Sequence, residues 1–132
     1  MLGSSKWQVR MAEPQDDPRF LKGIDEFNQQ LFFECHETLE EIWLEERGED
    51  RKFYQGIIQI AAGYYKLQQG VPVGAIKLWR TGIEKVEAFG PIFLGINVET
   101  LVTAVRANLA QLESGQPNTT DTLVPPTIPL LC

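Results

Sequence analysis

The chain has 132 residues, of which 43% are hydrophobic and 23% are charged, a composition that suits one globular domain. Its net charge of −6 disfavours nucleic acid and anionic membranes as partners. Because the sequence has no apolar run long enough to span a bilayer and begins without a signal-like segment, we expect a cytoplasmic protein with no membrane partner.

The pattern of polar and apolar residues divides the chain into three parts. Residues 1–16 are polar and lack periodicity, which predicts a flexible N-terminal arm. Residues 115–132 form a Pro/Thr-rich segment, which predicts an extended or disordered tail, although its last residues are apolar enough to dock. Residues 17–114 carry apolar positions at three- and four-residue steps, which is typical of amphipathic helices.

Local signals predict where these helices begin and end. Asp17 is suited to be the N-cap of a first helix and Pro18 its first residue. Gly48 is suited to end the second helix, and Asn97 is suited to cap the last one. No Gly or Pro separates the first two helices, so the pattern leaves open whether they are continuous. The expected segments are roughly 17–31, 32–46, 50–70, 73–89 and 98–112.

The third predicted helix is apolar around most of its circumference, which indicates a central position in a bundle. Gly56 and Gly63 lie seven positions apart, so they share one side of this helix and would let a neighbouring helix approach closely. Because the connections between helices are short, sequential helices should be antiparallel neighbours. We therefore predict an all-α protein, a five-helix, mainly antiparallel bundle; its wide apolar surfaces are also compatible with a homodimer.

The aromatic residues and Cys35 are expected in the core. Cys35 lies at the centre of an apolar stripe, which indicates a small buried side chain rather than a nucleophile. The other cysteine is the last residue of the tail, so the two do not form a disulfide framework. Four aromatics have the spacing of core residues, although they could also line a pocket: Trp43, Trp79, Tyr64 and Tyr65.

The densest polar cluster surrounds the only histidine, His36. Glu40 follows one helical turn later, and an imidazole and a carboxylate at this spacing can share a divalent metal. Glu37 could then act as a further ligand or as the general base. A hydrolytic metal site usually needs another ligand, which here would have to be a carboxylate such as Asp25, Glu26 or Glu84.

The same residues also support a structural interpretation. Glu40 would hold the His36 ring at the edge of the core, while the remaining glutamates of the cluster form a solvated face. Gln55 and Gln59, one turn apart on the third helix, could hydrogen-bond across to His36 or a glutamate, or could simply lie at the rim of that helix. The first interpretation predicts a metal-dependent hydrolase. The second predicts a non-catalytic helical binding or scaffold module, whose partner is a small molecule or a protein.

Two motifs within residues 20–89 resemble a known family. They are Phe33-Glu34-Cys35-His36-Glu37-x-Leu39-Glu40-Glu41-x-Trp43 and Phe53-Tyr54-Gln55-Gly56-Ile57-Ile58-Gln59-x-Ala61-Ala62-Gly63. Together they resemble domain-of-unknown-function family 309, small helical proteins sometimes labelled predicted metal-dependent hydrolases. The resemblance implies that His36, Glu37, Glu40, Gln55 and Gln59 form one polar centre between the second and third helices. Family members often have Gly near position 30, where this chain has Gln30.

Overall fold

The computed structural model describes residues 17–115, 123–128 and 130. In these residues the chain forms five α-helices and one very short β-hairpin, so the predicted all-α class is confirmed. The predicted arm over residues 1–16 lies outside the described residues. The helices are α2 (Pro18–Asn28), α3 (Phe32–Glu45), α4 (Asp50–Gln68), α5 (Pro72–Glu87) and α6 (Val98–Glu113). None of the helices in the described ranges combines the length and the hydrophobicity needed to cross a membrane.

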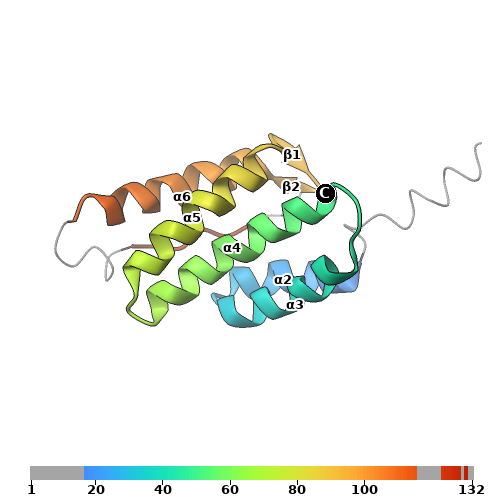
Figure 1. The fold of residues 1–132 in the computed structure, drawn as a ribbon, viewed down its shortest axis with the longest axis horizontal. Coiled ribbons are helices and arrows are strands. Elements are labelled where there is room, and N and C mark those ends of the chain that lie inside the picture. The colour runs from blue at the N-terminus through green and yellow to red at the C-terminus, as the bar shows by residue number, and fades with distance from the viewer. Residues whose placement is uncertain (1–16, 116–122, 129, 131–132) are drawn as a thin grey trace, which may run out of the picture.

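Helix α4 lies at the centre of the bundle, with α2 and α3 on one side and α5 and α6 on the other (Figure 1). Each helix packs on the next one along the chain, as expected for helices joined by short turns. Phe53, Tyr54, Ile57, Ile60 and Ala61 of α4 are all fully buried. The third predicted helix, which is apolar around most of its circumference, is therefore the central helix α4, as expected.

Glycines allow α4 and α5 to approach each other closely. A Cβ atom at Gly56 would lie 2.5 Å from Val86 Cγ1, and one at Gly82 would lie 2.9 Å from the backbone oxygen of Gly56. A Cβ atom at Gly63 would collide with the indole of Trp79. Gly56 and Gly63 thus lie on one side of α4, as their spacing predicted, and the neighbouring helix on that side is α5.

Capping residues fix the ends of the helices. The Asp17 side chain accepts a hydrogen bond from the backbone N–H of Arg19 at 2.8 Å, and Asn97 accepts one from Thr100 at 2.9 Å, so both predicted caps are present. A turn separates α2 from α3, and Gln30 adopts a φ of 64° there. Gln30 therefore takes the left-handed conformation that glycine adopts most readily.

The segment after α5 forms a hairpin that the sequence pattern did not predict. Strands β1 (Ile92–Phe93) and β2 (Ile96–Asn97) pair antiparallel, and Ile96 also bridges to Leu130 of the C-terminal segment. Each strand has two residues, which is too short for an alternating pattern to be recognised.

The C-terminal segment packs on the bundle, on the side facing away from the viewer in Figure 1. Ile128 is fully buried and Leu123 is nearly so. Asn108 of α6 donates a hydrogen bond to the backbone oxygen of Val124 at 3.1 Å and another to the Tyr64 hydroxyl at 2.6 Å. The apolar end of the tail, which we expected to be able to dock, therefore contributes Ile128 to the core.

Candidate functional site

Helix α3 presents His36 and Glu40 on the side that faces α4. The distance from His36 Nε2 to Glu40 Oε2 is 3.9 Å, and the two side chains are 31% and 46% exposed. The Phe33 ring lies next to the imidazole, with 6.0 Å between the ring centroids. The imidazole is therefore partly covered and lies close to its acidic neighbour, without being sealed into the core.

These two residues line an open pocket of about 230 Å³ together with both predicted glutamines. Gln55 and Gln59 of α4 form the opposite wall from His36 and Glu40 of α3. We call this cavity the His36 pocket, and its remaining lining residues are Trp43, Ile58, Ala62 and Leu78. Four of the five residues that the sequence placed in one polar centre thus share one interhelical space.

Two buried atoms of the His36 pocket residues have no hydrogen-bond partner. They are the indole Nε1 of Trp43, which is a donor, and the side-chain Oε1 of Gln59, which is an acceptor. Elsewhere in the described residues, Glu26 Oε1 and Tyr54 OH are the only other buried side-chain atoms of this kind. Native proteins leave few such atoms, because an unpaired buried polar group costs about 1–3 kcal/mol.

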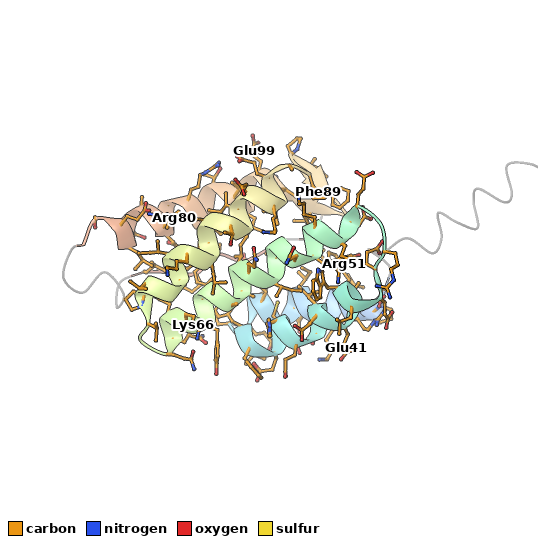
Figure 2. All side chains as sticks on the ribbon, in the orientation of Figure 1. Glu41, Arg51, Lys66, Arg80, Phe89 and Glu99 are labelled. Carbon is orange, nitrogen blue, oxygen red and sulfur yellow. The ribbon has the colours of Figure 1, made fainter. Side chains whose placement is uncertain are left out.

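A guanidinium group stacks on Trp43, one of the residues that line this pocket. The Arg51 guanidinium carbon stacks over the Trp43 ring at 3.9 Å from its centroid, and Arg51 Nε donates a hydrogen bond to the Trp43 backbone oxygen at 3.2 Å. Arg51 also lines a second, neighbouring cavity of about 500 Å³, which we call the Arg51 pocket. Its other lining residues are Gly48, Glu49, Lys52, Gln55, Ala88 and Phe89. Arg51 and Phe89 lie on the same face, at the end of the bundle where α4 begins (Figure 2).

The other predicted polar residue, Glu37, is exposed and is not among the residues that line the His36 pocket. Glu34 and Glu41 are exposed as well, as expected for a solvated acidic face. Cys35 is fully buried, and desolvation, aided by the nearby Glu26 carboxylate, raises the pKa of its thiol well above the usual value. The thiol is therefore a poor nucleophile, as its place on the apolar stripe predicted.

The described residues do not fit a metal centre with three protein ligands. Within residues 17–115, 123–128 and 130, no three His, Cys, Asp or Glu side chains come together in a group that could hold a metal ion. His36 and Glu40 form a pair without a third donor, and none of the candidates Asp25, Glu26 and Glu84 completes it. Catalytic zinc sites usually have three protein ligands and one open position.

Sequence reasoning did not identify several of the pocket residues. Leu78 belongs to α5, and the sequence around it does not indicate that its side chain lines a pocket between α3 and α4. The sequence gives no signal for Arg51, because a surface arginine near a helix start does not reveal its stacking partner. For Trp43 the sequence allows both a core and a pocket position, and the residue is half-buried in the pocket wall.

Comparison with known proteins supports the resemblance read from the two motifs. The family described as domain of unknown function DUF309 matches residues 20–78, a shorter span than the expected 20–89. The match includes every lining residue of the His36 pocket and ends at Leu78, the last of them. Ala88 and Phe89 of the Arg51 pocket lie beyond it.

A similar segment occurs in the uncharacterized protein YpuF of Bacillus subtilis (strain 168). The two chains are 38% identical over 58 residues, which make up 43% of this chain and 33% of YpuF. The likeness therefore spans about a third of that relative's length. The resemblance to the DUF309 family is confirmed over residues 20–78.

Proposed function

We propose that this protein is a non-catalytic binding module that holds a small polar molecule in the His36 pocket. The observation that carries the proposal is the pair of unpaired, complementary atoms, Trp43 Nε1 and Gln59 Oε1, on residues that line one open pocket. A molecule that accepts from the indole N–H and donates to the amide oxygen would offset the cost of leaving both atoms unpaired. Ligand binding would thus explain why these two buried polar groups have no hydrogen-bond partner within the protein.

The chemistry of the pocket favours a ligand with an amide-type edge, meaning a donor and an acceptor on adjacent atoms. Such an edge matches the donor on Trp43 and the acceptor on Gln59, while Ile58 and Leu78 supply an apolar wall. The volume of about 230 Å³ is below the range of roughly 300–1,000 Å³ typical of drug-sized ligands, so the pocket suits one small ring or group. Both unpaired atoms are shielded from solvent, so a ligand would reach them through rotation of the Gln59 side chain.

A metal-dependent hydrolase, the activity that the family resemblance implies, is the weaker proposal. His36 and Glu40 offer two donors where a catalytic centre usually needs three protein ligands. Glu37, the expected ligand or general base, is exposed and outside the His36 pocket lining. We therefore assign His36 and Glu40 to ligand binding, with Gln55 and Gln59 on the facing wall.

Nuclear magnetic resonance tests the binding proposal, because an indole N–H gives a separate signal. We expect small amides (acetamide, 2-pyrrolidone and uracil) to shift the indole signal of Trp43, assigned by comparison with Trp43→Phe. The Trp79 indole already donates to the Ile60 backbone oxygen at 3.2 Å in the core, so its signal should stay in place.

A matched pair of variants separates binding in the pocket from nonspecific effects. Ala62→Leu adds bulk to the pocket wall without removing a polar group, and Ala107→Leu adds the same bulk on an exposed face of α6. We expect Ala62→Leu to abolish the Trp43 shift and Ala107→Leu to preserve it, with thermal unfolding confirming that both variants fold. If none of the amides shifts the Trp43 signal, or if the shift survives Ala62→Leu, the binding proposal is wrong.

A further inference from the structure

We infer that the ligand of the His36 pocket extends into the Arg51 pocket and ends there in a phosphate, as a pyrimidine nucleoside monophosphate does. The inference rests on the proposed function and adds the chemical class of the ligand. Its amide-type edge would lie at Trp43 and Gln59, and its phosphate would lie at Arg51 and Lys52. Three features of the two pockets support this assignment.

The two pockets are neighbours, because Gln55 lines both of them. On α4, Lys52 lines the Arg51 pocket and Gln59 lines the His36 pocket. The two residues are seven positions apart, which corresponds to ~10 Å along the helix axis. A single group fills the smaller cavity of about 230 Å³, whereas the neighbouring cavity of about 500 Å³ leaves room for a sugar and a phosphate. An elongated molecule lying along α4 would therefore occupy both.

Arg51 is held in place for binding an anion. Stacking on Trp43 and the hydrogen bond from Nε to the Trp43 backbone oxygen fix the guanidinium, and neither contact uses its two terminal nitrogens. Among the described residues, no carboxylate forms an ion pair with Arg51. A planar guanidinium with two free nitrogens suits a phosphate, which it can contact with two parallel hydrogen bonds.

Lys52 adds a second cation, while Glu49 opposes it. Lys52 is exposed, lines the Arg51 pocket, and has no carboxylate partner among the residues described here. Glu49 is the one acidic lining residue, so the described lining carries two positive charges and one negative charge. The excess of positive charge favours an anion, and removing the Glu49 charge should strengthen its binding.

Calorimetric titration with uridine 5′-monophosphate, uridine and ribose 5-phosphate tests the inference. We expect the nucleotide to bind about tenfold or more tightly than uridine, which corresponds to ~1.4 kcal/mol from the phosphate. Lys52→Gln should lower the affinity for the nucleotide toward that for uridine and leave uridine binding unchanged, whereas Glu49→Gln should raise nucleotide affinity. Lys77→Gln, which changes an exposed lysine of α5 away from both pockets, is the matched control and should change neither.

The outcomes distinguish this inference from the proposed function. Equal affinities for the nucleotide and for uridine would overturn the phosphate site and leave binding in the His36 pocket intact. Ribose 5-phosphate binding as tightly as the nucleotide would overturn the two-pocket assignment, because the base would then contribute nothing. If none of the three compounds binds while amides still shift the Trp43 signal, the ligand class is wrong and the proposed function stands.

Discussion

The side-chain amide of Asn28 forms two hydrogen bonds with the backbone of Ile128, a residue 100 positions further along the chain. Asn28 Nδ2 donates to the Ile128 oxygen at 3.0 Å, and the Ile128 N–H donates to Asn28 Oδ1 at 2.6 Å. The paired bonds attach the C-terminal segment to the end of α2, where Ile128 is fully buried. A segment with the composition of a loose tail is thus part of the folded core.

This contact predicts that Asn28→Ala destabilises the protein. Losing the amide leaves two backbone groups of Ile128 without their partner, so we expect a loss of about 1–3 kcal/mol in the free energy of unfolding. Urea denaturation measures it, with Gln111→Ala, an exposed amide of α6, as the control. A change below about 0.5 kcal/mol, the usual range for surface substitutions, would mean that the C-terminal segment does not stabilise the bundle.

Gly63→Ala should destabilise the contact between α4 and α5. The added methyl would collide with the Trp79 indole, which is fully buried and hydrogen-bonded to Ile60. Overpacking of this kind typically costs 1–3 kcal/mol, so we expect a clear fall in the melting temperature. Gly74→Ala is the control, because its nearest neighbour is the flexible side chain of Lys66 at 3.2 Å and the exchange improves helix propensity. Equal melting temperatures for the two variants would contradict the close packing of α4 on α5.

Stability should fall in acid through the contacts of Arg19 with Asp17 and Glu45. Hydrogen bonds from the Arg19 guanidinium lower the pKa of both carboxyls below their usual values of 3.8 and 4.5. Both carboxyls have lower pKa values in the folded state than in the unfolded state. The contacts therefore stabilise the protein fully at a pH above the unfolded-state pKa values. This stabilisation is lost as the pH falls through the folded-state pKa values. The difference in the free energy of unfolding between the wild type and Arg19→Gln should therefore shrink as the pH falls below about 4.

Chemical denaturation across this pH range checks that expectation. Arg47→Gln is the matched control, because Arg47 donates to the backbone oxygen of Leu44 and its contact there does not titrate. A gap between wild type and Arg19→Gln that stays constant down to pH 3 would show that the two carboxyls contribute no acid sensitivity.

Zinc, manganese and iron(II) should not bind tightly in a 1:1 ratio at His36 and Glu40. His36 and Glu40 supply two donors, and the described residues provide no third ligand beside them. Isothermal titration of each metal into the wild type and into His36→Ala measures this directly. Tight stoichiometric binding that disappears in His36→Ala would instead support the metal-dependent hydrolase that the resemblance implies.

The sequence predicted the helices well because their signals are local. The stripe of α4 and the caps at Asp17 and Asn97 depend on residues within a few positions of one another. The spacing of His36 and Glu40, and of Gln55 and Gln59, likewise placed each pair on one helix face. Local periodicity therefore placed each pair on a helix face, and the family resemblance implied that the two faces meet.

What the sequence could not predict depends on how distant elements pack. The stacking of Arg51 on Trp43, the entry of Leu78 from α5 and the docking of Ile128 all depend on tertiary geometry. Glu37 follows His36 by one position, which turns its side chain by about 100° on α3, and it is not among the residues that line the pocket. The family resemblance, rather than the helical period, had implied that Glu37 belongs to the polar centre.

The free energy of unfolding of Gln59→Met tests most directly whether the polar pocket serves binding or structure. If Gln59 Oε1 is an unpaired acceptor kept for a ligand, replacing the amide with a side chain of similar length should leave stability unchanged or raise it by up to about 1 kcal/mol, while abolishing the amide-induced shift of Trp43. Asn108→Leu, which removes an amide bonded to Tyr64 and Val124, should lose about 1–3 kcal/mol in the same assay. A comparable loss in Gln59→Met would contradict the binding account and show that the polar centre holds the helices together.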